Sequence, residues 1–535
     1  MSEIHEECGV IAIYHLPSGP ESPLVPSQGR EEVSRLAARM LLDLQNRGQL
    51  AAGVSTYNPN RKQLLATYKE LGTVAEAFHQ SHPDQYARLM DELAGRAAIG
   101  HVRYAAENQR DRNYAHPFER SHIKKNKWFS FAFNGSLCNY EVLKQQLLKD
   151  ENYCFARDAD SEVFLHFLCG AVKEHGSDLL SVCQETTKTF DGGYALVFLN
   201  ALGEMFVARD PRGIKPMCYA FDGSLFAAAS ESVALFNLGF ASEDIKDVPP
   251  GAIVIVTPDK GVEIKQFADS PRTAFCFFEW VYFANAASVM EGKSVYLARK
   301  KLGEALARLE DVPIDENSIV VPVPDTSKAA ADGMAYALGV PCLEGLMRNR
   351  YTGRTFIEGG ETRKRKAETK YTPLPQVLEG KRVFLVDDSI VRSTTMRVLI
   401  ERLRDVGHAK EVHVRIPCPP IMGPCFYGSD MSTYSELFAT SHMVRNYGVE
   451  GVNCCEDLTT KWTFTPEIAV EMAKELGCDT VRFLPMQDVS DAIGIEPLWL
   501  CRACVTHENP TEWGCKLSDS ALEKFRNSLK VVQTK

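Results

Sequence analysis

The sequence predicts a two-domain protein that combines the α/β and α+β classes. Its 535 residues exceed what one hydrophobic core of ordinary size organises, so we expect two domains. Residues 383–386 are apolar and typical of a buried parallel strand, and a helical pattern begins at Met396. A further predicted strand, residues 412–416, follows this helix. Strand, helix and strand in succession predict a parallel sheet, with the ligand at the carboxyl ends of its strands.

Composition and charge argue against several classes of protein. The formal net charge of −10 argues against a nucleic-acid surface. Residues 363–366 form the only dense basic cluster, which a local anion-binding loop explains more simply. No apolar run approaches membrane-spanning length, and residues 1–7 are too short and too acidic for a signal peptide. We therefore expect a cytoplasmic protein that binds neither nucleic acid nor membrane.

The predicted strand 383–386 stops at two adjacent acids, Asp387 and Asp388. Hydroxyl residues follow before or at the start of the helix: Ser389, Ser393, Thr394 and Thr395. Their backbone N–H groups and hydroxyls can cradle a phosphate at the positive end of the helix. The two carboxylates can then meet ribose hydroxyls, directly or through magnesium. An ordinary turn with acidic caps is the alternative. The stretch resembles the phosphoribosyl pyrophosphate (PRPP) binding signature of the type I phosphoribosyltransferases.

The first half of the chain carries a set of short motifs in a fixed order. Cys8 and Gly9 stand ahead of an apolar strand, and four motifs follow at residues 44–49, 99–104, 133–135 and 160–162. Together they resemble the class II glutamine amidotransferases, whose N-terminal-nucleophile fold is an α-β-β-α sandwich. The resemblance runs from Cys8 to about Val256.

Amide hydrolysis needs a soft nucleophile, for which Cys8 is the candidate. A thiol at a mature N-terminus has its own general base in the free α-amino group, whose pKa lies near neutrality. We therefore expect residues 1–7 to be a propeptide that is removed. The resemblance assigns the oxyanion hole to the Asn134 side chain and the Gly135 backbone N–H.

The resemblance also implies a glutamine-binding set. Arg103 is assigned to the α-carboxylate of glutamine, Asp160 to its α-ammonium group, and Arg47 to the same site. A structural ion pair is the alternative for Arg103 and Asp160. The sequence departs from the family at Asn46, where histidine is usual, and at residues 105–108, where a threonine hydroxyl is usual. The altered residues 105–108, together with Ser393, motivate a second hypothesis, a divergent paralogue with a weak glutaminase that uses ammonia or another nucleophile.

Two stretches between the halves sharpen the resemblance. Residues 276–284 and the amphipathic helix that starts at Ser294 resemble the interdomain region of the glutamine PRPP amidotransferases. By this resemblance Thr326 joins Asp387 and Asp388 in a magnesium–PRPP site. Residues 348–356 supply guanidinium groups for the pyrophosphate. The candidates there are Arg350 and Arg354, and a solvated basic edge is the alternative.

Two further features concern the PRPP site. Residues 358–380 are rich in Gly, Lys, Arg and Pro, and we expect a mobile loop that closes over the substrate. Ser393 replaces the usual glycine of the phosphate loop, and its Cβ is expected to strain a tight turn.

Sixteen cysteines in a chain without an export signal are not expected to form disulfides. Some are buried small hydrophobes, as expected for Cys169, Cys183 and Cys218. A C-x-x-C motif near the end is compatible with metal binding, redox chemistry or a structural role. By the resemblance, four cysteines stand where one branch of the family holds a [4Fe–4S] cluster: Cys276, Cys425, Cys501 and Cys504. Tetrahedral zinc is the competitor. Cys454 and Cys455 lie in an apparent insertion and have no assigned role.

The resemblance implies four segments. Residues 1–7 are the propeptide, 8–268 the glutamine amidotransferase domain, 269–450 the phosphoribosyltransferase domain with the junction, and 451–535 an insertion and cluster-binding segment. The implied reaction converts PRPP, glutamine and water to 5-phosphoribosylamine, glutamate and pyrophosphate, with Mg²⁺ and the cluster as cofactors. The family also implies a homotetramer and feedback inhibition by purine nucleotides. A non-enzymatic PRPP sensor is a third hypothesis, but it gives no use to the retained Cys8.

Overall fold

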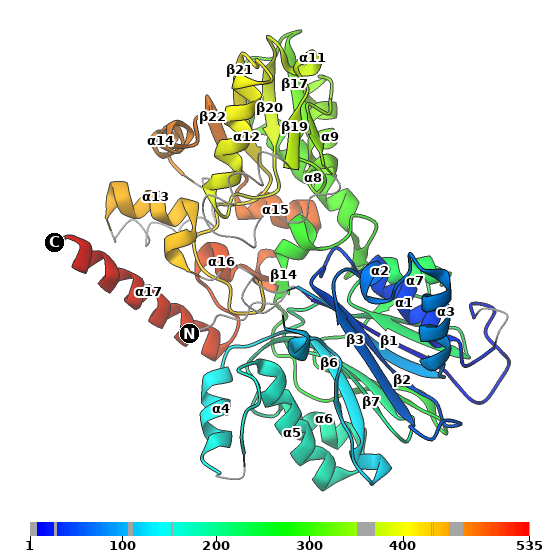
Figure 1. The fold of residues 1–535 in the computed structure, drawn as a ribbon. Coiled ribbons are helices and arrows are strands. Elements are labelled where there is room, and N and C mark those ends of the chain that lie inside the picture. The colour runs from blue at the N-terminus through cyan, green and yellow to red at the C-terminus, as the bar shows by residue number, and fades with distance from the viewer. Residues whose placement is uncertain are drawn as a thin grey trace.

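The computed structural model describes residues 8–25, 29–104, 111–150, 153–349, 370–429, 431, 433–448 and 464–533. These residues form two bodies joined by a layer of helices and short strands (Figure 1). The N-terminal body holds two antiparallel sheets, and the second holds a parallel sheet. The predicted combination of fold classes is confirmed.

Two antiparallel sheets pack face to face in the N-terminal body. Within the described residues, the first sheet has the order β11 (Lys246–Asp247), β9 (Cys218–Phe221), β10 (Leu225–Ala229), β1 (Gly9–His15), β4 (Ala97–Arg103), β2 (Ala51–Tyr57) and β3 (Leu65–Leu71). The second has the order β13 (Gly261–Gln266), β12 (Ala252–Thr257), β8 (Met205–Arg209), β7 (Gly192–Asn200), β6 (Phe129–Leu137) and β5 (Phe118–Arg120). Alternating apolar residues fill the interface, among them Val10 and Ala12 from β1 and Ala132 from β6.

Helices cover the two outer faces of this sandwich (Figure 1). Helices α1 (Val33–Asp43) and α7 (Ser232–Leu238) pack on the first sheet. On the second lie α5 (Asp160–His175) and α6 (Leu179–Thr187). The sandwich brings β1 and β6 into contact at its centre. This contact places the strand that follows Cys8 against the strand that carries Asn134.

The second body is built on four parallel strands in the order β17 (Ser318–Pro322), β20 (Arg382–Val386), β21 (Glu411–Ile416) and β22 (Thr480–Phe483). The predicted strands 383–386 and 412–416 are confirmed. The helices around this sheet include α8 (Val295–Arg308), α9 (Lys328–Leu338), α12 (Ser393–Asp405) and α14 (Pro466–Leu476). β22 shows that part of the segment 451–535 completes the parallel sheet.

The structure corrects two predicted elements. Helix α12 begins at Ser393, three residues before the predicted start, so the hydroxyl residues form its first turn. Of the predicted mobile loop, residues 358–369 lie outside the described residues. Its end is regular structure, namely β19 (Tyr371–Pro373), which pairs with β18 (Leu346–Arg348), and the short helix α11 (Pro375–Leu378). Pairing with a neighbouring strand satisfies the backbone there, which composition alone does not reveal.

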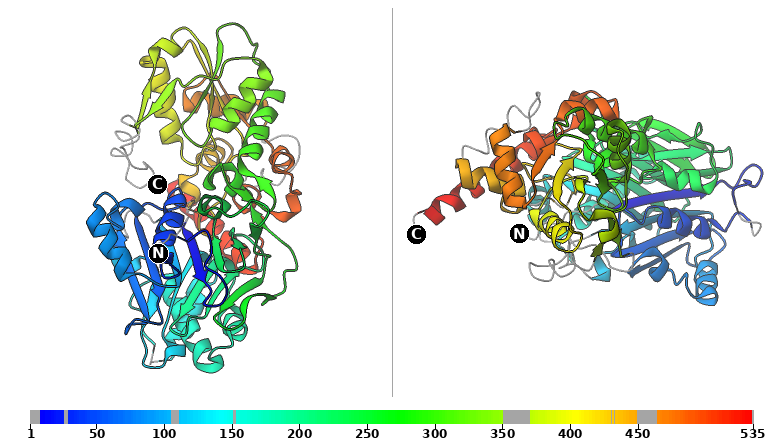
Figure 2. Two further views of the ribbon diagram at one scale, coloured as in Figure 1. Left: turned by 90° about the vertical axis from the view of Figure 1, so that its right-hand side faces the viewer. Right: turned by 90° about the horizontal axis from the view of Figure 1, so that it is seen from above.

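The chain end returns to the junction between the bodies. β23 (Leu500–Cys501) pairs in parallel with β14 (Phe275–Cys276), and the short helix α16 (Ala503–Thr506) follows. Helix α17 (Glu512–Gln533) then runs outward from the body (Figure 2). Among the described residues, no helix is both long enough and apolar enough to cross a membrane.

Candidate active sites

Cys8 lies immediately before β1, the strand that β10 and β4 flank. Its side chain is fully buried, and its thiol lies 3.8 Å from the carbonyl oxygen of Tyr104. Ser230 holds the start of this strand. Its hydroxyl accepts from the Val10 N–H at 3.0 Å, and its own N–H donates to the Val10 carbonyl at 3.0 Å. The nucleophile candidate is therefore fixed by a strand that is bonded on both sides.

The candidate oxyanion donors lie on β6. The Asn134 side chain is fully buried, and neither its amide nitrogen nor its amide oxygen has a hydrogen-bond partner among the described residues. A buried amide without partners is costly, so a ligand that satisfies it is expected. Gly135 has a φ of +137°, and a Cβ there would lie 1.9 Å from the Gly193 carbonyl oxygen. Only glycine fits this position.

The two candidate clamp residues for glutamine are buried near the same strands. Arg103 is fully buried at the end of β4, and its guanidinium carbon lies 5.4 Å from the centroid of the Tyr114 ring. Asp160 is the first residue of α5. Its carboxylate accepts from the Leu137 N–H at 2.8 Å and from the Ser136 hydroxyl at 3.2 Å. Because these donors directly follow Gly135 on β6, the acid is tied to the oxyanion strand. Residues 105–108, the altered stretch, lie outside the described residues.

Arg47 has a setting that differs from the predicted one. Its Nε donates to Glu231 at 2.6 Å, and its terminal nitrogens donate to both oxygens of Glu279, at 3.2 and 2.6 Å. All three side chains are buried. The guanidinium thus serves two carboxylates from the domain core and the junction, and a glutamine carboxylate would have to compete with both. The structure therefore favours an architectural role for Arg47. Neighbouring Asn46 donates to the same Glu231 at 2.8 Å.

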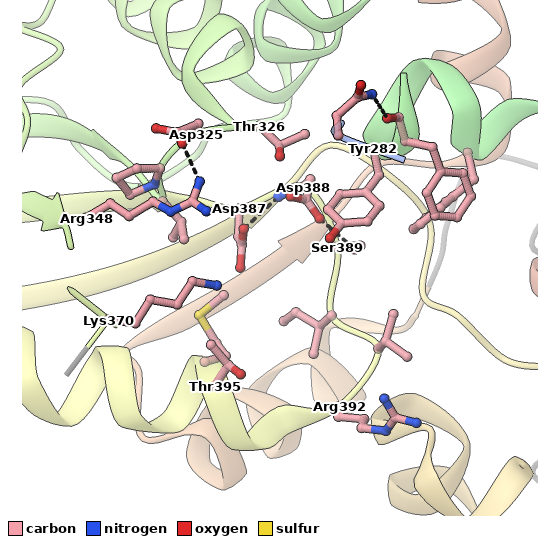
Figure 3. A pocket seen from close by; sticks show the side chains of 18 of the residues that line it. Tyr282, Asp325, Thr326, Arg348, Lys370, Asp387, Asp388, Ser389, Arg392 and Thr395 are labelled. Atoms are coloured by element: carbon pink, nitrogen blue, oxygen red, sulfur yellow. Dashed lines mark hydrogen bonds and ion pairs between the residues drawn. The ribbon is translucent and has the colours of Figure 1, made fainter. Parts of the chain in front are cut away.

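A cavity of about 350 Å³ lies between the two bodies, at the carboxyl ends of β17 and β20 (Figure 3). It brings together the predicted Thr326, Asp387, Asp388, Ser389 and Thr395. Its polar lining also includes Asn46, Gln49, Tyr104, Tyr282, Asp325, Arg348, Lys370, Tyr371 and Arg392. Ser393 and Thr394 do not line it, although they belong to the same first turn of α12. Arg350 and Arg354 lie outside the described residues.

The two adjacent acids are crowded and deeply buried. Burial, followed by the charge of Asp388, raises the pKa of Asp387 well above its ordinary value. Burial raises the pKa of Asp388 to about 6. Hydroxyls partly compensate, because Ser327 donates to Asp387 at 3.3 Å and Ser389 donates to Asp388 at 2.8 Å. The two carboxylates are hard oxygen ligands, and a divalent cation would relieve their repulsion. The Thr326 hydroxyl lies in the same cavity, so this set of donors fits magnesium.

Several cavity residues were missed by the sequence reasoning. Lys370 points toward Asp387 in the cavity (Figure 3). Arg348 forms an ion pair with Asp325, and the Tyr371 hydroxyl donates to the Pro324 carbonyl at 3.2 Å. Lys370 lies within the stretch 358–380 that was predicted as a loop, so no motif marked it. Arg348 begins the run 348–356 that was expected to supply guanidinium groups, but only Arg350 and Arg354 of that run were named as candidates.

Tyr104 connects the two candidate sites. Its carbonyl faces the Cys8 thiol at 3.8 Å, and the same residue lines the cavity that contains Asp387 and Asp388. Tyr104 ends the motif 99–104, which was predicted for glutamine alone. Its place beside the second site depends on how the domains meet, which no local pattern encodes.

The four cysteines predicted as ligands come from three separate stretches of the chain. Cys276 and Cys501 lie opposite each other on β14 and β23. The Cys504 carbonyl accepts from Met422 and Gly423, just before Cys425, at 2.9 and 3.0 Å. Burial, followed by the charges of Cys425, Cys501 and Cys276, raises the pKa of the Cys504 thiol. The four thiols thus lie close enough to influence one another.

The chemistry of the donor set fits either of the two predicted metal groups. Four soft thiols, three of them buried and the Cys276 thiol partly buried, are the ligands of a [4Fe–4S] cluster and also of tetrahedral zinc. Cys454 and Cys455 lie outside the described residues. Elsewhere, Cys183 and Cys218 are buried as predicted, and Cys169 is half-buried.

Comparison with known proteins places both halves in one family. A family model described as a glutamine amidotransferase domain matches residues 33–257. The chain is 36% identical to an amidophosphoribosyltransferase of Methanothermobacter thermautotrophicus, over 97% of each chain, and 34% identical to that of Bacillus subtilis, over 95% of each. A solved structure of glutamine PRPP amidotransferase from B. subtilis, complexed with ADP and GMP, matches with a TM-score of 0.76 and 33% identity. This structural match covers 95% of this chain and 98% of the B. subtilis chain.

Proposed function

The chain belongs to the amidophosphoribosyltransferase family, and from this premise we propose how its residues share the reaction. It is a glutamine-dependent enzyme that makes 5-phosphoribosylamine from PRPP, the first step of purine biosynthesis. The observation that supports our assignment best is the position of Tyr104, which contacts the thiol of one site and lines the cavity of the other. Neither a paralogue with a weak glutaminase nor a PRPP sensor requires that connection.

In the first half-reaction, the Cys8 sulfur attacks the side-chain carbonyl carbon of glutamine. The thiol proton passes to the α-amino group of Cys8, once residues 1–7 have been removed, and from there to the leaving nitrogen. The Asn134 amide and the Gly135 N–H stabilise the oxyanion, the C–N bond breaks, and ammonia leaves. Water then hydrolyses the thioester to glutamate. Arg103 and Asp160 orient the α-carboxylate and α-ammonium groups.

In the second half-reaction, the ammonia lone pair attacks C1 of PRPP, and the bond from C1 to the pyrophosphate oxygen breaks. Asp387 and Asp388 orient the ribose. Ser389, in the turn after β20, and the first turn of α12 with Ser393, Thr394 and Thr395 bind the 5-phosphate. Arg350 and Arg354 bind the pyrophosphate, and Arg348, which stands just before them in the sequence, lines the cavity. Thr326, Asp387 and Asp388 would hold Mg²⁺. When bound, this ion neutralises charge on the pyrophosphate.

The remaining proposals concern assembly and regulation. Cys276, Cys425, Cys501 and Cys504 would hold a [4Fe–4S] cluster, with ligands from both the junction and the chain end. We also propose a homotetramer in the cytoplasm that purine nucleotides inhibit. The nucleotides bound to the B. subtilis structure support this form of regulation.

The catalytic assignment is tested by measuring pyrophosphate release from PRPP with glutamine or with ammonia. We expect Cys8→Ala to abolish turnover with glutamine and to keep turnover with ammonia. The intact mass of the purified protein should match a chain that begins at Cys8. Turnover of the unaltered enzyme with ammonia alone would support the divergent paralogue, and no release with either donor would contradict the enzyme assignment.

The cluster is tested on protein purified without oxygen. We expect iron and acid-labile sulfide in equal amounts, both lost in Cys504→Ser, with Cys515→Ser as the control because Cys515 is exposed on α17. Zinc without sulfide would instead identify a mononuclear site.

A further inference from the structure

A short segment after Arg103 is pressed onto the edge of the first sheet. It comprises the 3-10 turn η2 (Arg112–Tyr114) and residues 115–117. It crosses β2 at Gly53, where a Cβ would lie 2.2 Å from the His116 carbonyl oxygen and 2.7 Å from the Lys69 Cβ. The absence of a side chain at Gly53 is therefore what allows this close contact. A substitution there would push the segment away from the sheet.

Lys69, on the edge strand β3, ties this segment down at three points. Its ammonium group donates to the carbonyls of Ala115 and Pro117, the latter at 3.2 Å. Its own carbonyl accepts from the Arg112 Nε at 2.8 Å. The Lys69 Nζ also lies 4.4 Å from the centroid of the Phe118 ring. An ammonium group that bridges two carbonyls on either side of one residue fixes that residue's backbone.

Tyr114, at the centre of the tied segment, faces the candidate clamp for glutamine. The centroid of its ring lies 5.4 Å from the guanidinium carbon of Arg103. A guanidinium against an aromatic ring gains cation–π attraction and loses freedom to rotate. The backbone of Arg103 is held from another direction, because Gly48 packs directly against it. Backbone and guanidinium are thus positioned by different elements.

We propose that Lys69 is a positioning residue for the glutaminase reaction: it fastens residues 112–117 so that Tyr114 holds the Arg103 guanidinium in place for the α-carboxylate of glutamine. This inference rests on the proposed assignment of Arg103. Lys69 itself touches neither substrate nor reacting atoms, and Tyr114 contributes the face of its ring and not its hydroxyl. The affinity for glutamine therefore depends partly on contacts at the edge of the first sheet.

The test compares Lys69→Met, which keeps length and removes the donors, with Lys69→Arg, which keeps a cation. We expect Lys69→Met to raise the KM for glutamine roughly tenfold, because small misplacements of a substrate clamp are costly. Turnover with ammonia should stay unchanged. Lys69→Arg should restore the KM to within about threefold. Lys62→Met, an exposed lysine on the preceding loop, should behave like the unaltered enzyme.

Variants of Tyr114 test the same proposal even if a substitution at Lys69 disturbs folding. Tyr114→Leu should raise the KM as Lys69→Met does, Tyr114→Phe should not, and the two damaging changes should be non-additive in one chain. Equal losses with glutamine and ammonia in Lys69→Met, or additive effects, would overturn the proposal. Arg103→Met separates the two ideas. If it leaves the KM unchanged, the clamp assignment fails. If it raises the KM and the variants at positions 69 and 114 do not, only the positioning role fails.

Discussion

Gly48 packs its α-carbon directly against the backbone of Arg103. A Cβ at Gly48 would lie 2.5 Å from the carbonyl carbon of Arg103 and 2.7 Å from its nitrogen and oxygen. The contact explains why the motif 44–49 needs glycine beside Arg47, since no side chain fits between the turn and β4. It also means that the end of β4, where Arg103 and Tyr104 lie, takes its position from this turn.

Gly48→Ala is therefore expected to damage the glutamine site. The new methyl group must displace backbone, so we expect a loss of stability of about 1–3 kcal/mol and a higher KM for glutamine. Thermal unfolding and steady-state kinetics measure the two effects. Gly170→Ala is the matched control, because a Cβ there meets nothing within 4 Å and Gly170 lies in helix α5. It should be neutral or stabilising by about 0.5–1 kcal/mol. A tolerated alanine at Gly48 would show that the turn can move.

Substitution of Arg47 by methionine is expected to lower stability, whereas the same substitution of Arg103 is expected to raise the KM for glutamine. Arg47→Met leaves Glu231 and Glu279 buried without their common cation, which typically costs about 3–5 kcal/mol. Denaturant unfolding should show this loss. Arg103→Met should change the KM for glutamine far more than stability. If Arg47→Met instead raised the KM at unchanged stability, Arg47 would be a glutamine ligand as the motif predicted.

The sequence predicted the fold well because its signals are local. The apolar run 383–386 and the periodic pattern of α12 are encoded within a few residues, and the order of motifs marks both domains. The acid pair could be placed at a ligand site for the same reason, since strand ends and helix starts are read from adjacent residues. Asp387 and Asp388 do line the cavity.

What could not be predicted depends on contacts between distant segments. Lys370 belongs to no motif and enters the cavity because β19 pairs with β18. Arg47 was assigned to glutamine from its motif. The motif could not reveal its partner Glu279, which lies 232 positions away at the junction. The same holds for Tyr104, whose second neighbour is the other domain. Residue type predicted the chemistry, and only the packed structure decides which partner a charge takes.

Asp247 predicts a pH dependence of stability. Burial, followed by the charge of Glu291, raises the pKa of Asp247 from 3.8 to about 6, with Arg209 and the N–H groups of Glu291 and Gly292 opposing the shift. Because the pKa of Asp247 is raised in the folded state, the contribution of this carboxyl group to folding stability is fully present below pH 3.8. This contribution is lost as the pH rises through about 6. Asp247→Asn stays neutral and can still accept both N–H groups.

The variant Asp247→Asn should therefore exceed the unaltered protein in stability above pH 6, by about 1–2 kcal/mol after allowance for partial exposure. The difference should vanish near pH 4, and unfolding measured across this range checks it. Asp244→Asn, an exposed neighbour, is the control and should leave the pH profile unchanged. A constant offset at every pH would mean that the carboxylate acts through packing and not through its proton.

Ser393→Gly tests whether the phosphate loop is strained. Ser393 is the first residue of α12, and it is not among the described residues with positive φ. The predicted strain from its Cβ is therefore absent, because the turn asks for no left-handed backbone at this position. We expect Ser393→Gly to leave the KM for PRPP within about twofold and to lower stability by roughly 0.5 kcal/mol, since glycine is a poor helix former. Thr395→Gly, in the same turn, should raise the KM for PRPP, because Thr395 lines the cavity. A several-fold lower KM in Ser393→Gly would show that the serine impairs phosphate binding after all.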